Sequence, residues 1–155
     1  MDDAGKLARK TLRHKAMDML SRREYAVAEL SRKLSAAGYE RDSVQDTVAQ
    51  LVADGLLSDA RFTEAFVRYR AGRGYGPLRI QAELRERGVD DAVVETYLDS
   101  GDSQWLQRSE AVRSKRFGVA RPVDFKERAR QARFLQYRGF TTEQARRALD
   151  GEEFE

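Results

Sequence analysis

The chain has 155 residues, of which 35% are charged and 41% hydrophobic, so it is long enough for one ordinary domain or several small stacked units. Cysteine is absent, which excludes disulfides and thiolate chemistry, and the single histidine, His14, leaves little for zinc, haem or a Ser-His-Asp triad. The sequence has no apolar run of about eighteen residues and no signal-peptide pattern, so we expect neither a membrane span nor a secretory signal.

Nine helices are predicted from apolar residues spaced near 3.6 positions and from signals at helix ends. Leu7, Leu12, Ala16 and Leu20 form the first apolar stripe. Pro77 suits the first turn of a later helix because its missing N–H is not needed there. No segment alternates with a period of two, which argues against strands. The predicted helices cover residues 5–22, 25–37, 42–54, 59–73, 77–87, 91–99, 104–117, 125–138 and 142–149.

One structural pattern occurs three times along the chain. Gly38, Gly88 and Gly139 lie 50 and 51 residues apart, and each follows a leucine by four residues and precedes an apolar residue. These leucines are Leu34, Leu84 and Leu135. Valine, leucine or alanine recurs six and ten residues after each glycine. The pattern predicts an all-α fold of three tandem three-helix repeats, residues 1–56, 57–101 and 102–155, which form an elongated, curved, solenoid-like molecule.

Charge is small in sum and uneven along the chain. The net charge is +3, and 23 of the 29 basic residues are arginine. Residues 5–23, 61–87 and 104–149 carry +6, +4 and +8, whereas residues 24–60 and 88–103 carry −4 and −5. A folded chain could gather these segments on opposite faces, although a solvated surface of ion pairs would also account for them. The excess of arginine favours contacts with phosphate or with a protein, since the planar guanidinium suits both.

No catalytic or metal-binding constellation is present in the sequence. His14 lies in a basic helix without a nearby carboxylate except Asp18, which indicates a solvated residue rather than a base. The glycines of residues 72–76 follow a helix and precede no Gly-Lys-Ser/Thr, so we interpret them as a mobile helix connection and not as a phosphate loop. The carboxylates of residues 90–99 are spaced as on a solvated helix face. We therefore predict that the chain is not an enzyme and needs no cofactor or metal.

Basic residues interleaved with aromatics give the clearest functional signal. They surround the glycine-rich loop at Tyr75 and recur in two later patches, near residues 113–121 and 128–133. Either nucleic-acid phosphates or an acidic protein surface would suit such patches. Tyr69 continues an apolar stripe and is expected in the core. The candidate partner-binding residues are Arg68, Arg70, Arg73, Tyr75, Arg79, Arg113, Lys115, Arg116, Arg130 and Arg133.

Three segments resemble the RecX family of bacterial recombination regulators. The segments are Leu20-Ser-Arg-Arg-Glu-Tyr-Ala-Val-Ala-Glu-Leu30, then Gly55-Leu-Leu-Ser-Asp-Ala-Arg-Phe62 with Phe66 and Arg70, and then Gly76-Pro-Leu-Arg79-Ile80 with Glu83-Leu84 and Gly88-Val89. The segment Arg133-Phe-Leu135 with Arg138-Gly139-Phe140 is similar as well. Ala145 stands where the family more usually has an aliphatic residue.

The resemblance implies a cytoplasmic protein of three three-helix repeats that binds the RecA recombinase filament on DNA. It also implies that the protein restrains ATP hydrolysis, strand exchange and filament growth, and it brings no catalytic residues. The modest net charge predicts weak, salt-sensitive affinity for single- and double-stranded DNA, and we expect a monomer with no membrane partner. The alternative is a stand-alone DNA-binding protein with helix-turn-helix-like repeats, against which the acidic third helices of the first two repeats argue. We also expect the loop around Tyr75 to matter more for function than for folding.

Overall fold

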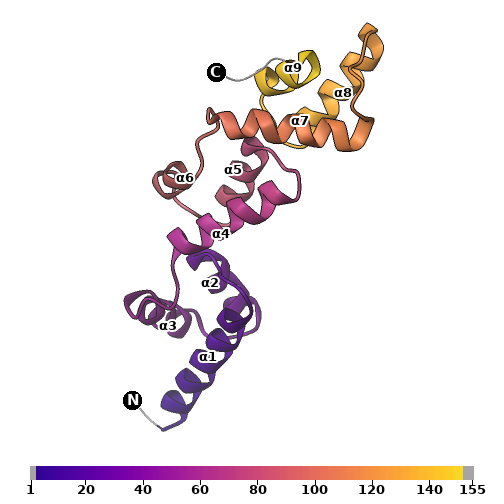
Figure 1. Ribbon diagram of the computed structural model, residues 1–155. Coiled ribbons are helices and arrows are strands. Elements are labelled where there is room, and N and C mark those ends of the chain that lie inside the picture. Colours follow the sequence, from indigo (N-terminus) through magenta and orange to yellow (C-terminus); the bar gives the residue numbers. More distant parts are fainter. Residues whose placement is uncertain (1–2, 152–155) are drawn as a thin grey trace. The chain divides into compact units, whose positions relative to one another are not determined.

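The computed structural model describes residues 3–151, which contain nine α-helices and no strand (Figure 1). Each predicted helix is confirmed, with ends that differ by at most two residues from the prediction. The chain therefore has the all-α fold expected from its apolar spacing. The helices are α1 (Asp3–Arg22), α2 (Val27–Ala36), α3 (Arg41–Ala53), α4 (Asp59–Gly72), α5 (Pro77–Glu86), α6 (Asp91–Tyr97), α7 (Ser103–Phe117), α8 (Phe125–Tyr137) and α9 (Thr142–Asp150).

The repeat pattern of the sequence corresponds to buried positions in all three repeats. The three leucines before the glycines, Leu34, Leu84 and Leu135, are completely buried. The three glycines have positive φ angles, between 81° and 103°, and end the second helix of each repeat in the left-handed conformation expected there. Thr141 and Gln144 form the predicted capping box at the start of α9, whereas Asp124 alone caps α8. In each repeat the pattern therefore marks the end of the second helix and one leucine of the core.

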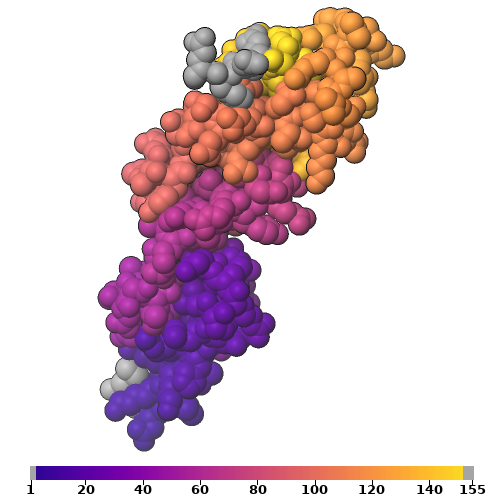
Figure 2. All heavy atoms as spheres, in the orientation of Figure 1, coloured from indigo at the N-terminus to yellow at the C-terminus, as the bar shows by residue number. Residues whose placement is uncertain are grey.

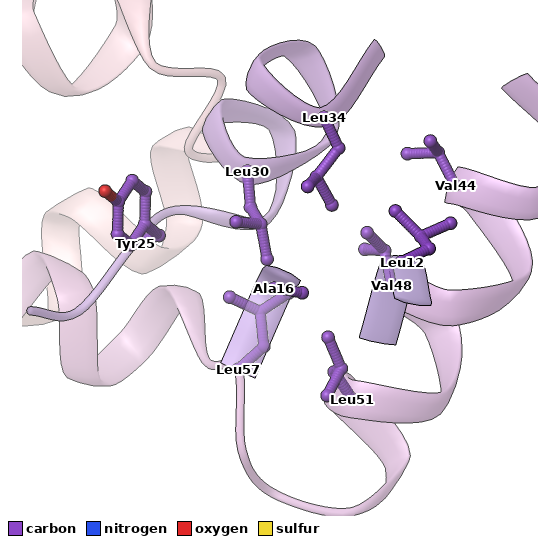
Figure 3. Packing of buried hydrophobic residues seen from close by; sticks show 9 residues of the cluster. All are labelled: Leu12, Ala16, Tyr25, Leu30, Leu34, Val44, Val48, Leu51 and Leu57. Atoms are coloured by element: carbon purple, nitrogen blue, oxygen red, sulfur yellow. The ribbon is translucent and has the colours of Figure 1, made fainter. Parts of the chain in front are cut away.

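Among the described residues, the first compact unit comprises residues 3–65 and 85–93. Its core lies between α1, α2 and α3, and Figure 3 shows leucine and valine side chains from these helices converging there. The spacing of Leu12 and Ala16 on α1 directs both toward α2 and α3, and both are buried. Nine residues form this cluster: Leu12, Ala16, Tyr25, Leu30, Leu34, Val44, Val48, Leu51 and Leu57.

The second compact unit comprises residues 66–84 and 94–151 of the described chain. Within it α7 packs against both α8 and α9, and α8 packs against α9. The boundary between the two units passes through α4, α5 and α6, so the helices of the second repeat contribute to both. No helix within residues 3–151 is both long enough and apolar enough to cross a membrane.

Backbone segments meet closely where the start of α5 packs against the end of α8. The Gly76 N–H donates to the Arg138 carbonyl at 2.8 Å, and the Leu78 N–H donates to the Gly139 carbonyl at 2.9 Å. A Cβ atom on Gly76 would lie 2.4 Å from the Gly139 carbonyl carbon and from the Phe140 nitrogen. Only glycine fits at position 76, because the neighbouring atoms are backbone and cannot rotate away.

We expect Gly76→Ala to destabilise the protein by about 1–3 kcal/mol, the usual cost of an overpacked site. For a chain of this length that lowers the melting temperature by roughly 2–12 °C. The matched control is Gly72→Ala, since Gly72 has helical backbone and nothing within 4 Å of its added Cβ. Thermal unfolding followed by circular dichroism should separate the two variants. Equal melting temperatures would contradict the close approach.

Candidate partner-binding groove

A groove of about 780 Å³ in the second unit contains several of the predicted site residues. It lies between the loop that follows α4, the middle of α7 and the end of α8. We call it the basic groove and define it by the residues that line it. These are Ala71, Gly72, Arg73, Gly74, Tyr75, Arg108, Ala111, Val112, Lys115, Arg116, Phe134 and Arg138.

The lining of the basic groove carries positive charge only. Five of its twelve residues are basic and none is acidic. Like charges gathered in a concave surface reinforce one another's potential and attract an anionic partner. Two aromatic rings, of Tyr75 and Phe134, lie among these cations. Such a mixture of guanidinium groups and aromatic faces suits a phosphate backbone with stacked bases, or an acidic protein segment.

The Tyr75 ring is surrounded by three guanidinium groups. The Arg70, Arg79 and Arg138 guanidinium carbons lie 3.8, 4.5 and 4.9 Å from the ring centroid. Glu83 is the carboxylate that balances them: its Oε1 accepts from Arg70 Nη2 at 2.9 Å and lies 3.9 Å from Arg79 Nε. One carboxylate thus serves two arginines, so the cluster keeps an excess of positive charge beside the basic groove.

The glycine-rich connection, which the sequence predicts to be mobile, makes hydrogen bonds with the end of α8. Gly74 has a φ of 89°, and the Gly76 N–H is bonded to the end of α8. Arg138 reaches back from α8, and its Nη1 donates to the Arg73 carbonyl at 3.4 Å. These contacts hold Arg73 and Tyr75 at the mouth of the groove and reduce the entropy that a partner would otherwise have to remove.

Arg70 has a structural role that the sequence did not indicate. Its side chain is only 18% exposed and joins α4 to α5 through Glu83. The prediction that the Tyr75 loop matters more for function than for folding remains untested, but Arg70 should contribute to folding as well, because its removal would leave a partly buried carboxylate with a weaker partner. Arg73 is exposed and has no ion pair within the described part of the chain, so it remains a surface candidate.

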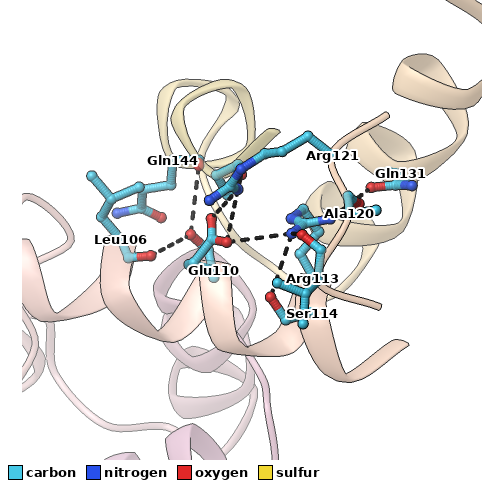
Figure 4. Close-up of polar contacts among 11 residues, drawn as sticks. Leu106, Glu110, Arg113, Ser114, Ala120, Arg121, Gln131 and Gln144 are labelled. Atoms are coloured by element: carbon cyan, nitrogen blue, oxygen red, sulfur yellow. Dashed lines mark hydrogen bonds and ion pairs between the residues drawn. The ribbon is translucent and has the colours of Figure 1, made fainter. Parts of the chain in front are cut away.

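Arg113 is the clearest error among the predicted site residues. Its side chain is completely buried, so it cannot belong to a surface patch with Lys115 and Arg116, which are exposed. Instead it donates to the backbone carbonyl of Val119 and to that of Ala120, which lies beside it in Figure 4. Helical spacing explains the error, since Arg113 and Lys115 lie two positions apart and therefore on opposite sides of α7, and the sequence alone does not say which side is buried.

The patch predicted on α8 is largely paired within the protein. Arg130 donates two hydrogen bonds to Glu127, at 2.8 and 3.0 Å. These bonds, with one from Gln131, lower the pKa of the Glu127 carboxyl from its ordinary value of 4.5 to about 2. Arg128 is bound to Asp150 at 2.6 Å. Arg133 is exposed and, among residues 3–151, has no ion pair.

One predicted surface residue of α4 lies outside the basic groove, one predicted core residue of α4 is exposed, and two residues of the groove were missed. Arg68 is exposed but does not line the groove, and Tyr69 is 62% exposed rather than part of the core. Arg108 and Arg138 line the groove although neither was predicted. For Arg138 the sequence shows only that it directly precedes the glycine that ends α8; its position in the groove follows from the contact between that glycine and α5.

Models of known protein families match all three repeats of the chain. The models for the first, second and third RecX three-helix domains match residues 13–51, 58–98 and 102–149. The chain belongs to the RecX family. The regulatory protein RecX of Halorhodospira halophila strain DSM 244 / SL1 is 45% identical over 148 residues, which cover 96% of this chain and 91% of the relative. That of Pseudomonas entomophila strain L48 is 43% identical, over 90% of each chain.

Solved RecX structures have the same fold. The crystal structure of RecX from Lactobacillus salivarius superposes with a TM-score of 0.76 and 18% identity, over 94% of this chain and 98% of that one. A second crystal structure, of a regulatory protein RecX, gives a TM-score of 0.78 over 97% of this chain and 80% of that one. The chain is thus a regulatory protein of the RecX family, which is not a family of enzymes.

Proposed function

We propose that this RecX-family chain binds the RecA–DNA filament and inhibits RecA-catalysed ATP hydrolysis, strand exchange and filament growth. In this proposal the protein acts in the cytoplasm as a monomer, and its three repeats cover residues 1–56, 57–101 and 102–155. Membership of the family supports RecA as the partner. The observation that carries the proposal on this chain is the basic groove, whose five cations face no carboxylate of the groove itself. A filament offers both phosphates and protein surface to such a groove, and weak, salt-sensitive contact with single- or double-stranded DNA is part of the proposal.

The alternative is a stand-alone DNA-binding protein with helix-turn-helix-like repeats. That protein would place a recognition helix with exposed Asn, Gln or Arg in the major groove. The third helices of the first two repeats, α3 and α6, carry acidic residues in their first turns instead, Asp42 and Asp91. Acidic side chains at this point would repel the phosphates beside a recognition helix, which favours the filament over duplex DNA alone.

Titration of the protein against RecA-catalysed, DNA-dependent ATP hydrolysis tests the proposal directly. We expect the rate to fall as the protein is added, and the protein to bind a RecA–single-strand filament much more tightly than bare DNA at about 0.15 M salt. Near-equal affinity for the filament and for bare DNA, with no effect on hydrolysis, would favour the stand-alone DNA-binding protein. Acceleration of ATP hydrolysis would contradict the proposed inhibition but would still support RecA as the partner.

A further inference from the structure

The three most exposed large hydrophobic residues of the described chain lie together between α7 and α8. Val119, Val123 and Phe125 are 84%, 95% and 87% exposed. We define residues 118–125 as the apolar loop. In Figure 2 the orange atoms of this part of the chain form part of the visible surface of the second unit. Single exposed apolar residues are ordinary, whereas three in eight residues mark an interaction surface.

The apolar loop is held in this exposed conformation by charged residues beneath it. Arg113 donates from Nη2 to the Val119 carbonyl at 3.2 Å and from Nη1 to the Ala120 carbonyl at 3.3 Å. Arg121 donates to the Ala148 carbonyl at 2.6 Å and forms an ion pair with Glu110 at 2.7 Å (Figure 4). Two arginines, one completely buried, thus tie residues 119–121 of the loop to α7 and to α9. A loop without such anchors would fold its apolar side chains inward, since their burial is favourable.

The other two repeats have no such loop. Their corresponding connections, residues 23–26 and 73–76, have four residues each and end on buried positions. In the third repeat the connection covers residues 118–124 and leads into Phe125, which is exposed. The fold of a repeat therefore does not require the apolar loop, and a role outside the fold accounts for its exposure and for the buried Arg113 that holds it.

The charges around the apolar loop indicate the chemistry of its partner. Lys126, next to Phe125, is exposed and, in the described part of the chain, has no ion pair. The nearby carboxylates are engaged within the protein: Asp124 caps α8, and Glu127 binds Arg130. The loop thus presents apolar side chains with an unpaired lysine beside them. Its complement is an apolar pocket with carboxylates at the rim, which is a protein surface and not a nucleic acid.

We infer that the apolar loop docks into an acid-rimmed apolar pocket on the protein part of the RecA filament, while the basic groove takes the phosphates. This inference rests on the proposed function. The two surfaces should differ in their response to salt. An attraction between the groove and phosphates weakens steeply as salt rises, whereas burial of Val123 and Phe125 does not depend on counterions.

The test compares the parent chain with Val123→Ser/Phe125→Ser in binding to RecA filaments on single-stranded DNA, at several salt concentrations. We expect the variant to bind filaments about 10- to 100-fold more weakly, and by a similar factor at every salt concentration, because two apolar side chains leave their pocket. Its binding to bare DNA and its melting temperature should stay those of the parent, since both side chains are in water. The matched control is Leu7→Ser/Val52→Ser, which changes two exposed apolar residues of the first unit and should bind as the parent does.

Several outcomes would overturn the inference. A parent chain that does not bind filaments at all would remove the proposed function and the inference with it. A parent that binds, together with a Val123→Ser/Phe125→Ser variant that binds equally well, would overturn the apolar loop alone. Loss of self-association in the variant, seen by sedimentation of the proteins without RecA, would assign the loop to a second copy. Loss of binding to phosphatidylglycerol vesicles, with filament binding intact, would assign it to a membrane surface.

Discussion

Arg73→Ala/Lys115→Ala should weaken the binding of this RecX-family protein to a RecA filament on single-stranded DNA by about tenfold at low salt, with little change in stability. Both side chains line the basic groove and are exposed, and neither has an ion pair within residues 3–151. Their removal therefore costs the fold almost nothing. An exposed charge contact is worth up to about 1 kcal/mol, and two such contacts account for the tenfold loss.

The salt dependence of this variant is the more decisive measurement. Each phosphate neutralised on a single strand contributes about −0.7 to the slope of log K against log salt. Loss of two contacts should therefore reduce the slope by about 1.4, so that parent and variant converge at high salt. Lys10→Ala/Arg41→Ala is the control, since it removes the same charges from exposed sites of the first unit. An unchanged slope for Arg73→Ala/Lys115→Ala, or an equal change in the control, would place phosphate binding elsewhere.

The helices and their repetition could be predicted from the sequence because both depend on local patterns. Apolar spacing and glycine positions gave the ends of α2, α5 and α8, and Leu34, Leu84 and Leu135 are buried as their shared register requires. Such signals lie within one or two helical turns of the residue that they place. The repeat could therefore be predicted without knowing which distant segments are in contact.

The basic groove could be predicted only in part, because it joins segments far apart in the sequence. Arg73 and Tyr75 were found from the loop itself, since arginine and tyrosine among glycines are an unusual combination. Arg108 comes from the first half of α7 and Arg138 from the end of α8, and nothing in either segment indicates the other. The same limit explains Arg70: its partner Glu83 lies on the next helix, so a charge that looked free on the sequence is paired in the fold.

Arg113 shows what the sequence conceals about charge. A basic residue between Val112 and Lys115 is typical of an exposed patch, and burial of an arginine is rare without compensation. Here the compensation comes from carbonyl groups of the following loop, whose backbone direction no local pattern fixes. The connection after α7 had to be known before the arginine could be placed beneath it.

Arg113→Ala should be the most destabilising of the substitutions considered, by roughly 3–5 kcal/mol, the cost of breaking a buried charged network. The Val119 and Ala120 carbonyls would lose their donor, the space of the buried side chain would be left empty, and Gln131 Oε1 would lose its contact at 3.4 Å. The melting temperature should fall by about 6–20 °C. Lys115→Ala, two residues on and exposed, should unfold with the parent.

The substitution Arg113→Lys separates the effect of the positive charge from the effect of the guanidinium geometry. A lysine keeps the positive charge but is a single ammonium group, so it cannot reach both carbonyls in the way that the forked guanidinium does. We expect the melting temperature of Arg113→Lys to lie between those of the parent and of Arg113→Ala. Hydrogen exchange at residues 118–121 should become faster, because the loop loses one of its two anchors. If the apolar loop docks as inferred, Arg113→Lys should also weaken filament binding, although Arg113 itself touches no partner. A variant with the parent's melting temperature and exchange rates would show that Arg121 and Glu110 hold the loop without it.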